Sequence, residues 1–418
     1  MHLGMPRRVA GASRRGPTTE RFYPVIASVH PFPARMAADI ALGRLGRLGP
    51  GALVLDPMAG SGTVIRAASD RGLRGLGFDV DPLAVLMARV WTRPIDVRRL
   101  RLRAGRVLEE AAARPAAIRL PWIDDDPETS AFVDYWFAPR QRSELRRISH
   151  VLSFLRGPIA DALRLGLSRI VVTKRPGAGA SLARDVSHSR PRRVLDESGY
   201  CVRDGFARSV ERLARCLEAH PPLGGVEVVL GDARRLCGVE DRSVDAIITS
   251  PPYLNAIDYL RGHRLALVWL GHRVGDLRVV RAGSIGSERG LADPERSAGL
   301  AAELMSGLKG LGPLSPRHRG MLARYAVDVA GLMSEAYRVI RPGGIATFVV
   351  GDSTLRGVFV ENSAIVKTAA QLAGFRFRSQ VRRRIQPGRR YLPPPDPAGR
   401  PELARRMSVE TIVAFRRD

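Results

Sequence analysis

The chain has 418 residues, of which 45% are hydrophobic, and it carries a formal net charge of +26. This length and apolar content exceed what one average domain needs, so we expect a core with inserted or appended material. The positive charge favours a polyanionic partner, because neutralised phosphates release condensed counterions. An arginine-biased genome is the alternative explanation, since only three of the 67 basic residues are lysine.

Several protein classes are disfavoured by the same sequence. The cysteines Cys201, Cys216 and Cys237 form no CxxC pair, which predicts free thiols and no metal site. No apolar run approaches the roughly 20 residues of a membrane span. Residues 1–22 are basic and rich in Gly, Pro and Ser without a signal-peptide apolar segment, so we expect a disordered tail, with a transit peptide as the alternative. The expected location is the cytoplasm.

Short apolar runs alternate with helical segments along the chain. This alternation predicts an α/β fold, namely a doubly wound, mostly parallel sheet with helices on both faces. The segments Phe375–Ile385 and Val409–Arg416 are expected to form an antiparallel pair at its edge. The five runs expected to be parallel strands are Ala52–Asp56, Leu73–Asp79, Val226–Gly231, Val244–Thr249 and Gly344–Val350.

Two connections are longer than a compact sheet domain usually carries, which suggests functional insertions. Residues 97–224 contain an Arg-rich helical region, Pro139–Leu165, and a loop, Lys174–Arg193, of small, polar and basic residues. Such a loop suits contacts to phosphates or base edges, although it would also fit an ordinary surface loop. Residues 259–319 form the second insertion. The candidate DNA contacts in the loop are Lys174, Arg184, His188 and Arg190.

The first chemical motif lies where the first strand ends, in the sequence DPMAGSGT of residues 56–63. Its glycines allow a ligand to approach the backbone, and the helix that follows offers free N–H groups. Neither GKS, GKT nor GxGxxG occurs here, so a phosphate cradle is poorly supported. The residues expected to bind a cofactor are Asp56, Pro57, Met58, Gly60, Ser61, Gly62 and Thr63.

The second motif is the acidic end of the next strand. Asp79 follows the glycine loop by about 20 residues, the spacing at which a carboxylate binds the two ribose hydroxyls of a nucleoside. Asp81 is the second candidate, and a helix cap before Pro82 is its alternative role.

The third motif is Ser-Pro-Pro-Tyr at residues 250–253, which follows a buried strand. Its prolines fix the backbone and lack N–H donors, so carbonyl oxygens stay free to accept hydrogen bonds. Ser250 Oγ and the Pro251 carbonyl could hold both N–H groups of an exocyclic amine, while Tyr253 offers a face for an extruded base. An ordinary proline turn is the alternative. The candidate catalytic residues are Ser250, Pro251, Pro252 and Tyr253.

These motifs resemble the amino-methyltransferases of DNA, which make N4-methylcytosine or N6-methyladenine. The resemblance implies S-adenosylmethionine as cofactor, a seven-stranded Rossmann-like sheet, and direct methyl transfer without a strong base. It covers residues 23–96, 225–258 and 320–418, taken as the catalytic core, and assigns Asp232 to the cofactor adenine and 349–353 to the same cleft. The segment expected to pack against the methionine end of the cofactor contains His30, Pro31, Phe32 and Pro33.

The resemblance also indicates the target. Members with Ser at the position of Ser250 mostly methylate cytosine N4, so we expect that reaction on double-stranded DNA. Adenine N6, an RNA amine and a non-catalytic DNA-binding protein are the alternatives. Asn255 and Arg261 are expected near the base or the DNA backbone, 97–224 is expected to read the target, and 259–319 to contact DNA. We also expect a restriction endonuclease as a partner and no bound metal. Within the cytoplasm, the expected location is the nucleoid of a bacterium or archaeon.

Overall fold

The structure is a computed structural model. It describes residues 29–30, 36–115, 117–173, 180–182, 191–193, 199–254, 258–287, 293–385 and 409–418.

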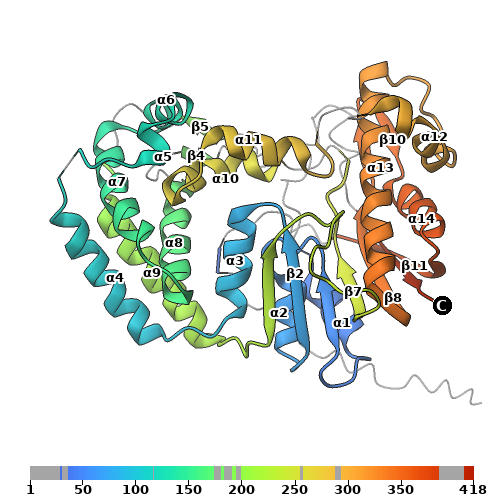
Figure 1. Ribbon diagram of the computed structural model, residues 1–418, viewed down its shortest axis with the longest axis horizontal. Coiled ribbons are helices and arrows are strands. Elements are labelled where there is room, and N and C mark those ends of the chain that lie inside the picture. Colours follow the sequence, from blue (N-terminus) through green and yellow to red (C-terminus); the bar gives the residue numbers. More distant parts are fainter. Residues whose placement is uncertain are drawn as a thin grey trace, which may run out of the picture.

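A seven-stranded sheet forms the centre of the molecule, with the strand order β11-β12-β8-β7-β1-β2-β6 (Figure 1). Five of its strands are parallel, whereas β12 is antiparallel to β8 and β11 is antiparallel to β12. The predicted doubly wound, mostly parallel sheet with an antiparallel terminal pair is therefore confirmed. The strands are β1 (Leu53–Asp56), β2 (Arg74–Asp79), β6 (Val226–Leu230), β7 (Val244–Thr249), β8 (Ile340–Gly351), β11 (Arg376–Arg384) and β12 (Val409–Arg416).

The strand order reverses between β1 and β7, which fixes where a ligand can bind. From β1 the chain continues outward to β2 and β6, while from β7 it continues in the other direction to β8. The carboxyl ends of β1 and β7 therefore flank the switch point, which is where doubly wound sheets bind ligands. Both strands are nearly buried along their length, as expected for strands covered on two faces.

Helices cover both faces of the sheet. On one face, α1 and α2 pack against Val54 and Ile248, and on the other, α13 and α14 pack around Leu55 and Ile247. α12 packs against α13 and α14, on the right of Figure 1. These helices are α1 (Ala38–Leu45), α2 (Thr63–Ser69), α3 (Pro82–Thr92), α12 (Pro294–Met305), α13 (Pro316–Val339) and α14 (Asn362–Leu372).

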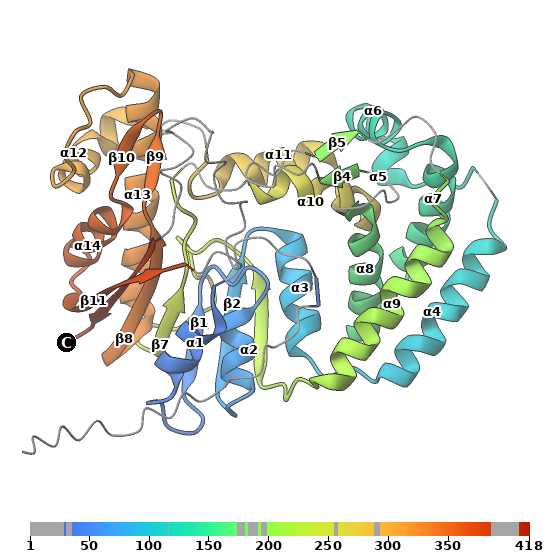
Figure 2. The same ribbon diagram turned by 180° about the vertical axis from the view of Figure 1, so that it is seen from behind.

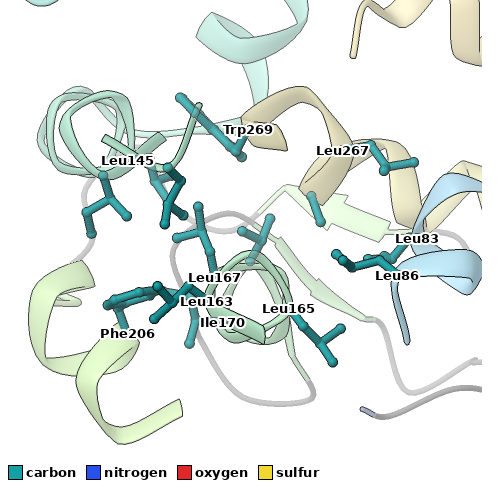
Figure 3. Packing of buried hydrophobic residues seen from close by; sticks show 14 of the residues in the cluster. Leu83, Leu86, Leu145, Leu163, Leu165, Leu167, Ile170, Phe206, Leu267 and Trp269 are labelled. Carbon is teal, nitrogen blue, oxygen red and sulfur yellow. The ribbon is translucent and has the colours of Figure 1, made fainter. Parts of the chain in front are cut away.

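The remaining helices form a separate mass beside α3, which we call the helical lobe. It contains all helices from 97–219 together with 259–283, so segments from both predicted insertions share one hydrophobic core. Figure 3 shows this core, where Leu145, Leu163 and Phe206 lie with Leu267 and Trp269 of the second segment. The elements are α4 (Val97–Ala112), α5 (Pro121–Asp124), α6 (Pro127–Trp136), α7 (Pro139–Ser153), α8 (Pro158–Val171), α9 (Val202–Ala219), α10 (Tyr259–Leu267), η2 (Val268–Leu270) and α11 (Val274–Gly283).

A buried arginine joins the sheet core to the helical lobe. Arg66 of α2 donates to the carbonyl of Trp91 (2.7 Å), where the chain leaves for the lobe, and to that of His220 (2.9 Å), where it returns. Its charge is balanced by Asp70 at 2.8 Å. Because Arg66 is only 2% exposed, each of these bonds replaces water that the side chain has lost.

Two small sheets complete the fold. One joins β3 (Val172–Thr173), β4 (Ala180–Leu182) and β5 (Pro191–Arg193), and the other is the hairpin of β9 (Ser353–Leu355) and β10 (Val358–Val360). Figure 2 shows the hairpin above β8, across the molecule from the helical lobe. Within the described ranges, no helix is both long and apolar enough to cross a membrane.

Candidate functional site

The glycine loop joins β1 to α2 by a turn that needs glycine. Gly60 and Gly62 have positive φ values of 51° and 90°, which L side chains rarely adopt. A Cβ on Gly62 would also lie 3.0 Å from the Ala88 side chain of α3, which packs directly under the loop. The loop therefore keeps its backbone close to α3, and the first turn of α2, beginning at Thr63, faces the switch point.

Asp79, at the end of β2, holds the glycine loop in place. Its Oδ2 accepts a hydrogen bond from Gly60 N at 2.8 Å, and its Oδ1 accepts one from Asp81 N at 2.9 Å. Burial raises the pKa of Asp79 to about 6, and the charge of Asp81 adds to this rise. The carboxylate thus lies beside the loop, at the edge where the resemblance expects a ribose.

Asp56, at the end of β1, connects the loop to the strand that carries the tetrapeptide. Its Oδ1 accepts hydrogen bonds from Thr249 Oγ1 at 2.7 Å and from Met58 N at 3.2 Å. Burial raises the pKa of Asp56 to about 7, and these two hydrogen bonds only partly oppose the rise. Near neutral pH this carboxyl group is consequently poised between its two protonation states.

The tetrapeptide starts directly after β7 and is fixed against the end of β8. Ser250 Oγ donates to the Val349 carbonyl at 3.0 Å and lies 3.5 Å from the hydroxyl of Tyr253. Burial raises the pKa of Tyr253 to about 12, so its phenol stays neutral. Since a serine hydroxyl has one proton and two lone pairs, donation to Val349 leaves Ser250 able to accept from another group.

The segment after the tetrapeptide is held by the first residues of β9 and α14. Ser353 Oγ donates to the carbonyl of Leu254 at 2.6 Å, and Asn362 Nδ2 donates to Ser353 Oγ at 2.8 Å. The segment 349–353 therefore lines the tetrapeptide, as the sequence predicts for one cleft. Asp352 belongs to this group, and burial raises the pKa of its carboxyl.

Two features of the glycine loop fit a bound polar ligand. Ser61 Oγ is buried, and it has no hydrogen-bond partner among the residues that the structure describes. Asp56 is only 3% exposed and has no basic side chain among its hydrogen-bond partners there, so a ligand with a positive charge would favour its ionised form. Uncompensated buried polar groups of this kind are concentrated at binding sites.

Asp81 is a helix cap and a hydrogen-bond partner of His263, which favours the alternative role considered for it. Its Oδ1 accepts from Leu83 N at 2.9 Å at the start of α3, and its Oδ2 lies 2.5 Å from His263 Nδ1. Both carboxylate oxygens of each aspartate thus accept a hydrogen bond from the protein, but those of Asp79 accept from backbone N–H groups alone.

Asp232, expected near the cofactor adenine, is held by an arginine. Arg234 Nη2 lies 2.6 Å from Asp232 Oδ2, and its Nη1 lies 2.5 Å from Asp328 of α13. Burial acts to raise the pKa of Asp232, but the hydrogen bonds from Arg234 outweigh it and lower that pKa. A ligand at Asp232 would therefore share this carboxylate with Arg234.

His30 lies beside the core of the helical lobe and Arg261 lies on α10, while eight other predicted site residues lie outside the described residues. His30 is buried beside Val29, whose side chain belongs to the helical-lobe core and whose carbonyl accepts from Arg169 of α8. Arg261 of α10 forms an ion pair with Asp258 at 3.3 Å. The predicted residues outside the described ranges are Pro31, Phe32, Pro33, Lys174, Arg184, His188, Arg190 and Asn255.

Three residues of the site were missed by sequence reasoning. Thr249 binds Asp56, His263 binds Asp81 and Arg234 binds Asp232. Thr249 directly precedes the tetrapeptide and Arg234 lies two residues after Asp232, so their positions were a usable signal. His263 is 182 positions from its partner, and nothing in the sequence relates the two. Across the described part of the chain, no group of three or more His, Cys, Asp or Glu side chains could hold a metal.

Comparisons with known proteins give structural likenesses only. No protein-family model matches the chain, and no curated protein matches it. A TehB-like SAM-dependent methyltransferase from Corynebacterium glutamicum aligns with 92% of this chain and 89% of its own, at 9% identity and a TM-score of 0.30. Geranyl diphosphate C-methyltransferase from Streptomyces coelicolor aligns with 91% of this chain and 76% of its own, at 8% identity and a TM-score of 0.35.

A third structure carries a name related to DNA. This candidate DNA modification methylase from Thermus thermophilus is 18% identical and aligns with 45% of this chain and 52% of its own, at a TM-score of 0.25. At such identities and TM-scores the likenesses identify no substrate. The fold described above rests on the strand order and pairing of this chain itself.

Proposed function

We propose that this chain is an S-adenosylmethionine-dependent methyltransferase that modifies the exocyclic N4 of cytosine in double-stranded DNA. One observation carries the proposal. The glycine loop, Asp79 and the tetrapeptide are far apart in the sequence, yet they meet at the carboxyl ends of β1, β2 and β7. Direct hydrogen bonds join Thr249 to Asp56 and Gly60 to Asp79. A ligand-binding switch point and a tetrapeptide suited to holding an amine thus share one edge of the sheet.

The residues around the glycine loop would hold the cofactor. Asp79 would accept hydrogen bonds from the two ribose hydroxyls, and the glycine loop would let the backbone approach the ligand. Ser61 Oγ is buried without a hydrogen-bond partner among the described residues, and Asp56 is buried without a basic side chain among its hydrogen-bond partners there. S-adenosylmethionine would supply a methyl group on a positively charged sulfur. That charge is consistent with a carboxyl group whose ionised form has no cationic protein partner.

The tetrapeptide would position the amine. Because Ser250 Oγ donates its proton to Val349, its lone pairs point to a role as an acceptor for one amine N–H. The Pro251 carbonyl would accept the second N–H, while Pro252 stiffens the turn and the ring of Tyr253 supports the extruded base. Held in this way, the nitrogen lone pair is free to attack. Alignment of donor and acceptor then supplies most of the catalysis, and no strong base is needed.

The charge of the chain supports a nucleic-acid substrate, and the serine of the tetrapeptide favours cytosine. We propose that residues 23–96, 225–258 and 320–418 form the catalytic core. The insertion 97–224 would read the target, and 259–319 would contribute DNA contacts. We also propose a restriction endonuclease as a partner. The N6 of adenine and an amine of RNA are alternative substrates for the same chemistry. Their distinction is an outcome of the experiment below.

Sequencing of modified bases tests the proposal directly. The chain and its Ser250→Ala variant would be expressed in cells without endogenous DNA methylation, and their genomic DNA would be read by a method that distinguishes methylated bases. We expect N4-methylcytosine at one recurring sequence with the wild type and none with the variant. Methylation of RNA alone, or unmodified nucleic acid despite measurable cofactor binding, would overturn the DNA assignment.

A further inference from the structure

The helices α10 and α11 follow the tetrapeptide in the chain and belong to the helical lobe. We call the segment 258–283 the α10–α11 arm. Its apolar side chains, including Leu265 and Leu277, belong to the lobe core. Its first residue, Asp258, caps α10 and lies 2.5 Å from Arg281 near the end of α11. This ion pair joins the two ends of the arm. Figure 1 shows both helices above α3, between the other helices of the lobe and α13.

The first link between the arm and the cofactor side of the site is the pair of His263 and Asp81. His263 Nδ1 lies 2.5 Å from Asp81 Oδ2, and the two side chains are 11% and 8% exposed. A carboxylate only accepts hydrogen bonds, so Nδ1 carries the proton of this contact. Asp81 in turn donates its backbone N–H to Asp79, the proposed ribose acceptor. Two hydrogen bonds therefore connect Asp79 to α10.

The second link is at the other end of the arm. Arg234 Nη2 donates to the Gly283 carbonyl at 2.7 Å while the same guanidinium binds Asp232, the proposed adenine residue. Arg324 of α13 donates to the neighbouring Ala282 carbonyl at 2.9 Å. A cation beside the last carbonyls of a helix is favourable, because those carbonyls lack helical partners. The end of α11 is thus held by Arg234, which also binds the carboxylate of Asp232.

We propose that the α10–α11 arm couples cofactor binding to DNA binding, with His263 and Arg234 as its positioning residues. The inference rests on the proposed function, because it takes Asp79 and Asp232 as cofactor contacts. Cofactor binding at Asp79 or Asp232 changes a hydrogen bond that restrains the arm. The arm follows the tetrapeptide in the chain and packs in the core of the lobe. Because coupling between two sites is reciprocal, DNA on the lobe strengthens cofactor binding by the same factor.

Hydrogen–deuterium exchange tests the cofactor half of this inference without DNA. S-adenosylhomocysteine is the probe, and its binding is first measured by calorimetry. We expect its saturation to slow amide exchange in α10 and α11 of the wild type. In His263→Ala the slowing should be lost from α10, although the variant still binds the probe. If the wild type binds the probe and exchange in α10 and α11 is unchanged, the inference is wrong. If the probe does not bind, both the proposed function and the inference fall.

DNA binding with and without S-adenosylhomocysteine tests the other half. We expect the probe to tighten binding of a mixed-sequence duplex by about fivefold or more in the wild type, the usual lower range of such coupling. His263→Ala should reduce this factor to about one. His263→Asn should restore much of it, because the amide nitrogen replaces Nδ1 as donor. His318→Ala, in the first turn of α13 and outside the arm, is the matched control and should keep the wild-type factor. Full coupling in His263→Ala would contradict the inference.

Discussion

The surface carboxylates of the helical lobe and the two enclosed carboxylates at the ends of β1 and β2 have different hydrogen-bond partners. In the lobe, acids on the helix surfaces face arginines, as where Arg101 pairs with Glu211 and Glu218 and Arg103 pairs with Glu110. At the carboxyl end of the sheet, Asp56 and Asp79 accept hydrogen bonds from uncharged donors, and burial raises both pKa values. These lobe acids are therefore paired with arginines, whereas Asp56 and Asp79 have no arginine among their hydrogen-bond partners in the described part of the chain and could be satisfied by a ligand.

This difference separates stability from function. Pairs on the lobe surface are exposed, and exposed ion pairs contribute about 0–1 kcal/mol each. The enclosed carboxylates of Asp56 and Asp79 reduce stability in their ionised form, which favours a functional explanation for them. This distinction is wrong if loss of an ion pair on the lobe surface abolishes folding or activity, or if replacement of Asp56 and Asp79 changes neither stability nor ligand binding.

The largest expected effect is at the junction between the two regions. Arg66→Met removes a buried cation that holds the carbonyls of Trp91 and His220. It should lower the free energy of unfolding by about 3–5 kcal/mol, because buried groups are left unpaired. Arg103→Met on the lobe surface is the control, with an expected loss below about 1 kcal/mol. Urea denaturation measures both, and equal losses would remove the distinction.

A smaller effect, confined to turnover, is expected for the tetrapeptide. Ser250→Ala should reduce turnover about a hundredfold, the usual cost of losing one hydrogen bond to the reacting group. Its dissociation constant for S-adenosylmethionine should stay within about threefold, because the serine acts on the amine. Methyl-transfer kinetics and calorimetry separate the two quantities. A variant that lost cofactor affinity in proportion to turnover would place Ser250 in the cofactor site instead.

Substitution of the aspartate that ends β2 and of the one two residues later should change the dissociation constant of S-adenosylmethionine to extents that differ by about tenfold. Asp79→Ala removes the proposed ribose acceptor and the contact with Gly60, so it should weaken S-adenosylmethionine binding the more strongly. Asp81→Ala removes a helix cap and the contact with His263, which lie farther from the ligand. A tenfold difference corresponds to about 1.4 kcal/mol. Calorimetry with equal or reversed losses would refute the assignment of Asp79.

The smallest effect is a pH dependence in the unliganded protein. The folded pKa of Asp56, about 7, lies above its ordinary value of 3.8. The folded state therefore binds more protons than the unfolded state between these values, and stability falls as the pH rises from about 4 to 7. Asp56→Asn cannot titrate, so it should exceed the wild type in stability by at least about 1 kcal/mol at pH 8 and by less at pH 4. A difference independent of pH would show that Asp56 is not the titrating group.

The sequence predicted the sheet better than it predicted the lobe. Strands such as 244–249 were recognisable because they are continuous apolar runs ending in a chemical motif. The shared core of 97–219 and 259–283 was not predicted, because an amphipathic helix shows that it packs but not against which partner. Asp79 was selected from its spacing to the glycine loop and from its place at the end of the predicted strand. The contact of Asp81 with His263 depends on how the fold brings two distant segments together. The contact of Asp232 with Arg234 depends on the conformation of the arginine side chain.

Product analysis with the purified protein tests the central claim most directly. The protein would be incubated with methyl-labelled S-adenosylmethionine and duplex DNA, and the DNA would then be digested to nucleosides. We predict label in N4-methylcytosine, and none in the digest from Ser250→Ala. Label in a ring-carbon product such as 5-methylcytosine, or no label in any amino-methylated nucleoside although the cofactor binds, would contradict the assignment of this site to amine methylation.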